Sequence, residues 1–348
     1  MAGQATLRLS VLDLSPVSSG STAGDALRNT LDLAKLADRL GYVRYWLAEH
    51  HNIRHIASAV PEVMIGHVAD VTTGIRVGSG GVMLPNHMPL KVAETFRTLE
   101  ALHPGRIDLG IGRAPGTDEL TALALRGLRG VPTADDFPDQ LEDLLAFFSG
   151  GFPDTHPFRH ITPMPEGVQT PEIWLLGSSG YTAELAASLG LSFAFAHHIN
   201  PGPALAALRL YRERFRPSAY LAAPRSLLAV SAVCADTDER ADELAGSYDL
   251  TILRLRQGRP APVASVAEVA AYPFTPAERE QIRATRLRLF VGAPATVRER
   301  LARFAEAAGV SEVMVTTTMH DHQDRRRSYT LLAEAFALSP AARADVSM

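Results

Sequence analysis

Residues that can transfer protons recur directly after short apolar runs in this 348-residue sequence. Glu49, His50 and His51 follow one such run, and His197 and His198 follow another. Histidine suits proton transfer because the pKa of its imidazole lies near neutrality. Neighbouring strand residues point to opposite faces, so only one of His50 and His51 can enter a shared site. The alternative is a histidine that only holds a loop in place. The recurrence of histidines at several predicted strand ends favours a site.

A second pattern could bind an anion. Between a predicted strand and a predicted helix stand Gly177, Ser178, Ser179, Gly180 and Tyr181. Glycine lets the backbone approach a ligand closely, and serine hydroxyls can join the free amides at a helix start to hold a phosphate. Arg113, at the end of an earlier apolar run, could supply the matching charge. The alternatives are an ordinary turn with a serine helix cap and a surface ion pair of Arg113.

Two glycine-rich segments bear on cofactor binding. Gly80 and Gly81 interrupt a strand pattern, which often marks a bulge or a close approach to a ligand, and otherwise a packing need. Residues 110–116 nearly match the dinucleotide-binding fingerprint, but the third glycine comes one residue late. No strand ends in an acidic residue about 20 positions further on. A nicotinamide-binding Rossmann fold is therefore not expected.

The histidines also allow a metal site to be considered. His320 and His322 flank Asp321, so both rings could share one face of an extended segment, and imidazoles bind zinc well. The chain shows no set of histidines and acidic residues with recognisable metalloenzyme spacing. We therefore expect no catalytic metal, and a metal-dependent hydrolase is kept as a rival class of enzyme.

The elements that must position these residues alternate between strands and helices. Predicted strands cover residues 7–14, 43–49, 75–84, 106–112, 173–176, 191–196, 226–235 and 312–318. Amphipathic helices are predicted at 25–40, 58–73, 89–102, 137–148, 182–189, 203–216, 238–255, 294–308 and 324–337. Eight such strands predict an α/β fold, a (β/α)₈ TIM barrel over residues 1–348 with a less regular insertion near 256–289. A doubly wound open sheet is the rival fold.

Composition excludes several classes of protein. Apolar residues make up 46% of the chain, charged residues 21%, and the formal net charge is −4, which argues against a mainly electrostatic nucleic-acid binder. The single Cys234 can form no internal disulfide and no thiolate metal site. No apolar run approaches the roughly 18 residues of a membrane span, and the start of the chain lacks a signal-peptide pattern. We expect a soluble, cytoplasmic protein.

Several segments together resemble the bacterial-luciferase-like family of flavin-dependent monooxygenases. They are RYWLAEHH (44–51), IRVGSGGVMLPNHMPLKVAETF (75–96), PGRIDLGIGRAPGTD (104–118), LGSSGYTAELAASLGL (176–191), and the late VGAPATV and EVMVTTT. They span nearly the whole chain in the family's order, and their combination is specific. The resemblance is closest to the branch that includes oxygenases of bacterial polyketide pathways.

The resemblance implies that FMN lies in the barrel mouth. His50 matches the family's catalytic histidine, and Gly80 and Gly81 match a site where a non-prolyl cis peptide often supports the flavin ring. Arg113 matches the phosphate-contacting arginine, and residues 177–181 match a second phosphate-binding loop. Gly112 stands where the light-emitting luciferase subunit carries a reactive cysteine, so light emission is not implied.

The resemblance also implies a reaction and its partners. Reduced FMN (FMNH2) and O2 would oxygenate a small organic substrate, for example one of polyketide type. A separate flavin reductase would supply FMNH2, because no NAD(P)H motif is visible in the sequence. A homodimer is expected from the family. An oxidoreductase that uses the deazaflavin F420, and a flavin-binding protein without catalysis, remain alternatives. Segments 151–172 and 256–289 are expected to form a lid over the substrate.

Overall fold

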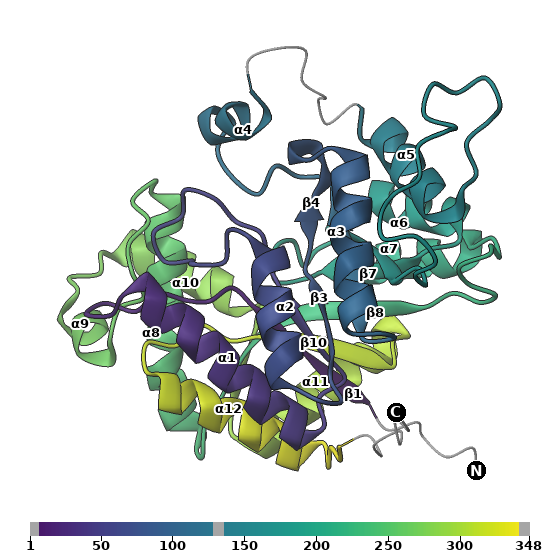
Figure 1. Cartoon of the computed structure of the whole chain (residues 1–348). Helices are drawn as coiled ribbons and strands as arrows, with labels where there is room; N and C mark the ends of the chain where they lie inside the picture. Colours follow the sequence, from purple (N-terminus) through teal and green to yellow (C-terminus); the bar gives the residue numbers. More distant parts are fainter. Residues whose placement is uncertain (1–6, 128–135, 341–348) are drawn as a thin grey trace, which may run out of the picture.

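Eight parallel strands close into a barrel, as predicted (Figure 1). The structure, a computed structural model, describes residues 7–127 and 136–340, so both ends of the predicted domain 1–348 lie outside the described residues. The barrel strands are β1 (Arg8–Asp13), β2 (Arg44–Leu47), β3 (Arg76–Ser79), β5 (Ile107–Gly112), β6 (Glu172–Gly177), β7 (Ser192–Ala196), β8 (Ser226–Cys234) and β10 (Glu312–Thr316). β10 pairs with both β1 and β8, which closes the ring. The alternative of an open sheet is wrong.

Two short strands extend the barrel at its carboxyl-terminal end. β4 (Val82–Met83) continues beyond β3 and pairs with the end of β5. β9 (Leu289–Gly292) pairs with the last residues of β8. The predicted strand at 75–84 is thus divided in two by Gly80 and Gly81.

The nine predicted helices are present and surround the barrel. They are α1 (Ala23–Leu40), α2 (Pro61–Val71), α3 (Pro89–Leu102), α5 (Phe137–Ser149), α6 (Gly180–Leu189), α7 (Ala204–Arg214), α8 (Asp238–Arg256), α11 (Pro294–Ala308) and α12 (His322–Ala335). α1 shows why the sequence signals work: Thr22 and Asp25 form a capping box, and Gly41 ends the helix in a left-handed conformation. None of the helices that the structure describes is long and apolar enough to cross a membrane.

Three helices and a 3₁₀ turn were not predicted. They are α4 (Glu119–Arg126), α9 (Val266–Ala271), α10 (Pro276–Arg286) and the 3₁₀ turn at Leu84–Asn86. α9 and α10 lie in the insertion at 256–289, which is therefore more regular than expected. Both begin at capping boxes, Ser265 with Glu268 and Thr275 with Glu278, so a local signal for each helix stands in the sequence.

The prediction that segment 151–172 forms part of a lid is wrong. This segment joins α5 to β6, and a connection from a helix to a strand reaches the amino-terminal end of the barrel. It rests against α3, where the Arg97 guanidinium donates to the carbonyl of Pro165 at 3.4 Å and the Met164 amide donates to Glu94 at 3.4 Å. In Figure 1 it lies beyond α5, on the opposite side of the molecule from α9 and α10.

The insertion at 256–289 does reach the carboxyl-terminal end of the barrel. The Val263 amide donates to the carbonyl of Val17 at 2.8 Å, and the Ser19 amide donates to the carbonyl of Val263 at 2.8 Å. Val17 and Ser19 lie in the segment that follows β1 at its carboxyl-terminal end, so the insertion forms part of the rim of the mouth. A lid role for this segment stays a prediction.

Side chains fill the barrel, so the site must lie above them. Trp46 and Trp174 meet edge to face inside it, with ring centroids 5.4 Å apart, and Leu12 and Met314 pack beside them. Larger apolar clusters lie between the strands and the surrounding helices. The interior is therefore packed, and the open space for a ligand is at the mouth.

Candidate functional site

The predicted site residues meet at the carboxyl-terminal ends of four neighbouring strands. β2, β3, β5 and β6 are hydrogen-bonded in that order around the barrel. His50 follows β2, Gly80 and Gly81 follow β3, Arg113 follows β5, and residues 177–181 pass from β6 into α6. Because parallel strands all end on the same side, these residues occupy one arc of the mouth.

His50 is held in one orientation by the backbone. Its amide donates to the carbonyl of Ser58 at 2.9 Å, and its Nδ1 lies 3.2 Å from the carbonyl of Gly116. A carbonyl can only accept, so Nδ1 carries the proton and Nε2 is the basic nitrogen. Burial lowers the pKa of His50, which keeps the ring neutral at pH 7. The arrangement suits a residue that accepts a proton at Nε2.

His51 points elsewhere, as the strand argument predicted. Its Nε2 lies 3.0 Å from Oε1 of the fully buried Glu49. The same carboxylate accepts from Nε2 of His87 at 3.0 Å and from the Met83 amide at 2.9 Å. Burial opposes ionisation of Glu49, but the hydrogen bonds from His87, His51 and Met83 outweigh it and lower the carboxyl pKa. Glu49 thus ties the loop after β2 to the segment after β3.

Glu62 completes a group that could be mistaken for a metal site. Ligand atoms of Glu49, Glu62 and His87 lie within 4.8 Å of one another. Both oxygens of Glu49 already accept hydrogen bonds, so this carboxylate has little capacity left for a cation. Burial raises the pKa of Glu62, which favours its protonated form beside Glu49. Glu49 and His87 are better described as hydrogen-bonded partners, with Glu62 beside them.

The metal hypothesis for residues 320–322 does not fit the geometry. His320 donates from Nε2 to the carbonyl of Ser19 at 3.0 Å, whereas His322 Nε2 lies 2.8 Å from Asp32. Asp321 caps α12 through the amides of Gln323 and Asp324. These three side chains face different partners, so they cannot share one ion in this arrangement.

His198 belongs to the mouth, although the sequence argument assigned it no role. It follows β7, and its Nδ1 lies 3.2 Å from the carbonyl of Ala229, which again leaves Nε2 as the basic nitrogen. Burial lowers its pKa to about 4, and His50 contributes to that shift, so the two rings are near enough to interact. The available signal was its place at a strand end, the feature that identified His50.

Gly80 and Gly81 have no room for side chains because atoms of neighbouring strands lie against them. A Cβ at Gly80 would lie 2.6 Å from Leu12 Cδ1, and a Cβ at Gly81 would lie 2.7 Å from the carbonyl oxygen of Gly110. Both distances are shorter than real carbon contacts allow. The peptide bond between the two glycines is cis, as the resemblance implied. The backbone at this point therefore packs closely against Leu12, Trp46 and Gly110 of β5.

Residues after β5 and β6 bring together a helix start and an arginine, the two features that the sequence singled out for binding an anion. Ser179 begins α6 without a side-chain hydrogen bond to the helix, so the first amides of α6 are not capped. The Arg113 guanidinium stacks on the Tyr181 ring at 4.5 Å. Within residues 7–127 and 136–340, no carboxylate forms an ion pair with Arg113. A helix N-terminus and an uncommitted arginine are what a phosphate group requires.

Comparisons with known proteins agree with this geometry. The family described as luciferase-like monooxygenase matches residues 7–312. A luciferase-like monooxygenase of Escherichia coli K12 is 42% identical, over 94% of this chain and 96% of its own. An N-acetyl-S-alkylcysteine monooxygenase of Bacillus subtilis 168 is 37% identical, over 94% of this chain and 98% of its own.

Solved structures share the barrel. Apo-MsnO8 superposes with a TM-score of 0.88 at 42% identity, covering 96% of this chain and 100% of its own. The oxygenating component of 3,6-diketocamphane monooxygenase of Pseudomonas putida, in complex with FMN, shares the fold at 19% identity (TM-score 0.72; 95% and 98% covered). An F420-dependent secondary alcohol dehydrogenase does so at 14% identity (TM-score 0.68; 95% and 99% covered).

The family match favours an oxidoreductase over the metal-dependent hydrolase. It covers most of the chain, and the related chains align almost end to end. The chain belongs to the luciferase-like monooxygenase family and is an oxidoreductase.

Proposed function

We propose that this protein is a monooxygenase that uses FMNH2 and O2 to oxygenate a small organic molecule. The observation that carries the proposal is the pairing, in one mouth, of the start of α6 and Arg113 with the neutral, oriented imidazole of His50. FMN ends in a phosphate, which matches the start of α6 and Arg113, and its flat ring system would lie beside Gly80 and Gly81. Bound in its reduced form, FMN supplies the electrons that activate O2.

The chain's own residues bind, orient and transfer protons in this proposal. Arg113 and the α6 amides hold the phosphate, and Ser178 is positioned for this because its carbonyl accepts from Asn200 at 3.0 Å. Gly80 and Gly81 support the ring. His50 accepts or returns a proton at Nε2, and His198 offers a second neutral imidazole. The α9–α10 insertion at the rim limits the access of water.

The experiment that tests the function supplies FMNH2 by photoreduction and follows O2 uptake and product mass. N-acetyl-S-alkylcysteine is the first substrate to use, since a relative that is 37% identical acts on such molecules, and polyketide-type substrates are the second. We expect FMN to bind and one oxygen atom to be added to the substrate. A protein that binds reduced F420 but not FMN would be a hydride-transfer enzyme and would overturn the proposal.

The partners follow from the same proposal. A separate flavin reductase supplies FMNH2, and the protein works as a homodimer. Exposed apolar side chains on and before α2, such as Val60 and Val63, are available for contact between two copies. O2 uptake with NADH and the protein alone should be absent and should appear when an FMN reductase is added. Light scattering measures the oligomeric state.

Replacement of Arg113 by glutamine will weaken FMN binding by about ten- to a hundredfold, because a hydrogen bond to a charged group contributes about 1.5–3 kcal/mol. The affinity for riboflavin, which has no phosphate, should stay unchanged. Fluorescence titration of both flavins measures the two affinities. Equal loss for FMN and riboflavin would show that Arg113 supports the fold of the mouth and does not bind the phosphate.

A further inference from the structure

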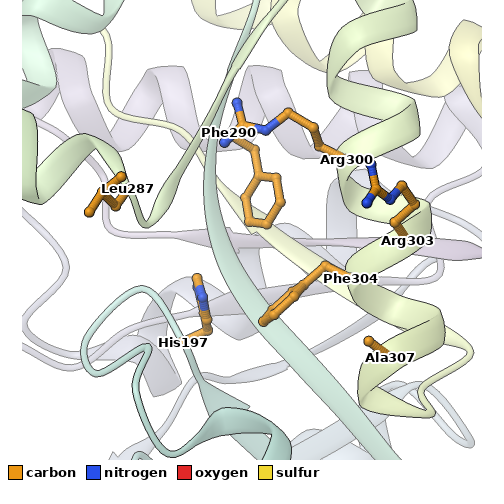
Figure 2. Close-up of a pocket in the computed structure, with 7 residues that line it drawn as sticks. All are labelled: His197, Leu287, Phe290, Arg300, Arg303, Phe304 and Ala307. Atoms are coloured by element: carbon orange, nitrogen blue, oxygen red, sulfur yellow. The ribbon is translucent and has the colours of Figure 1, made fainter.

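A second cavity lies outside the barrel mouth, between the loop after β7 and helix α11. Its volume is about 370 Å³, within the range of small-molecule sites. Figure 2 shows its walls: Phe290 from β9, Phe304 from α11 and His197 from the end of β7, with Leu287 at one side. None of the residues assigned to the proposed flavin site lines it.

His197 is the polar residue inside this cavity. Only 6% of its surface is exposed, and its ring centroid lies 4.8 Å from that of Phe304. In the part of the chain that the structure describes, its buried Nδ1 has no hydrogen-bond partner. Burial lowers its pKa to about 4, so the ring is neutral at pH 7 and can donate one hydrogen bond. No hydrogen bond among the described residues uses the ring N–H of His197, so the imidazole keeps hydrogen-bonding capacity beside the cavity.

The charge around the cavity is positive. Arg300 and Arg303 project from α11 at its edge, as Figure 2 shows. Arg300 stacks on Phe290 at 5.3 Å and donates to the carbonyls of Leu289 and Val291, which fixes its position. Arg303 has one distant carboxylate partner, Glu299 at 3.8 Å, and both of these side chains are exposed. Two cations over an aromatic wall favour an anionic ligand with an apolar body.

The cavity and the mouth lie on two sides of the same strand end. His197 and His198 are neighbours, but His198 bonds to Ala229 and interacts electrostatically with His50, whereas His197 contacts Phe304 of α11. A molecule in the cavity therefore would not occupy the mouth. We propose that this cavity is a second binding site, for an organic carboxylate whose apolar body lies between Phe290 and Phe304 and whose carboxylate faces His197, Arg300 and Arg303.

Two carboxylates with different bodies test this proposal: 2-naphthoate, which is flat, and octanoate, which is an alkyl chain. Calorimetry should show one molecule of at least one of them bound per chain, and the uncharged 2-naphthamide or octanamide should bind much more weakly. Nitrogen chemical shifts of the His197 imidazole should change during the titration. Added FMN should not displace the carboxylate, so the result is independent of the proposed function.

Variants on α11 locate the site. Ala307 is exposed at the edge of the cavity, so Ala307→Phe fills it without removing core packing and should abolish binding. Ala302→Phe, on the same helix and away from the cavity, should bind as the wild type does. Arg303→Gln should weaken binding about two- to fivefold, the effect of an exposed charge, and Arg298→Gln should not.

Any of four results would overturn the proposal. The first three are that neither carboxylate binds, that Ala307→Phe binds as tightly as the wild type, and that the amides bind as tightly as the carboxylates. Displacement by FMN would also overturn it, because the molecule would then occupy the mouth.

Discussion

Replacement of His50 by alanine will lower substrate oxygenation by about a hundred- to ten-thousandfold, the usual contribution of a positioned acid–base group. The expectation rests on geometry: the Ser58 and Gly116 carbonyls fix the backbone and Nδ1, so Nε2 has one direction. The measurement is product formed in a single turnover with photoreduced FMN, together with the affinity for FMN, which should change little.

Two controls separate proton transfer from support of the fold. His67→Ala makes the same chemical change at an exposed position on α2 and should leave turnover unchanged. Free imidazole should restore part of the turnover of His50→Ala, because it can enter the space left and carry a proton. A His50→Ala enzyme that keeps more than about a tenth of wild-type turnover would refute the assigned role.

The pH dependence has a definite sign. Burial lowers the pKa of His50 below its ordinary value of about 6.5, so the proton-accepting neutral form predominates at pH 7. Turnover should therefore be level near neutrality and fall only as the solution becomes acidic enough to protonate the ring. His198 has a pKa of about 4, so its own protonation comes in acid as well. The fall in turnover at acid pH that we assign to protonation of His50 should be absent from the residual activity of His50→Gln.

The sequence predicted those parts of the site that depend on topology. Each strand is a short, largely apolar run, the helices have their own period and stop signals, and a parallel barrel brings all strand ends together. His50, Arg113 and residues 177–181 could therefore be placed in one mouth from their positions alone. The proposal of FMN rests on the family resemblance, because a helix start with an arginine fits many phosphates.

Contacts between distant segments could not be predicted in this way. Segment 151–172 looked like a lid because it is long, but the direction of its connection places it beside α3. The bonds of Glu49 to His51 and His87 join residues up to 38 positions apart, and no local pattern encodes them. His197 and His198 are identical neighbours in the sequence, yet His198 lies at the mouth and His197 lines a cavity beside α11.

The amino-terminal end of the barrel contains a network of ion pairs that no sequence motif predicted. Arg44, the first residue of β2, is almost fully buried and bonds to Asp108 at 2.7 Å, to Glu312 at 2.9 Å and to Glu172 at 3.0 Å. Each carboxylate stands at or near the start of a different strand. Asp108 also accepts from the Trp46 indole at 2.8 Å, which links the network to the packed interior. Residues at this end of a barrel serve stability.

Substitution of Arg44 by methionine will therefore cost about 3–5 kcal/mol of unfolding free energy, because it leaves buried carboxylates without their shared cation. Urea denaturation measures the loss, and FMN affinity of the folded variant should be unchanged since the mouth lies at the other end. Arg28→Met is the matched control: its ion pair with Asp25 is exposed, and its loss should cost under about 1 kcal/mol.

At acid pH the difference in unfolding free energy between the wild type and Arg44→Met will become smaller. Burial opposes ionisation of Glu172, but Arg44, Arg76 and Arg225 outweigh it and hold the carboxyl pKa below its ordinary value. A lowered pKa stabilises the folded protein above the ordinary value of about 4.3, and that contribution is lost as the pH falls through the folded-state pKa. Arg44→Met lacks part of this contribution at neutral pH and has less of it to lose in acid. A difference in unfolding free energy that stayed constant between pH 7 and about pH 3 would contradict the assignment of the network to stability through charge. Only the packing of the Arg44 side chain against Trp174 would then explain the loss.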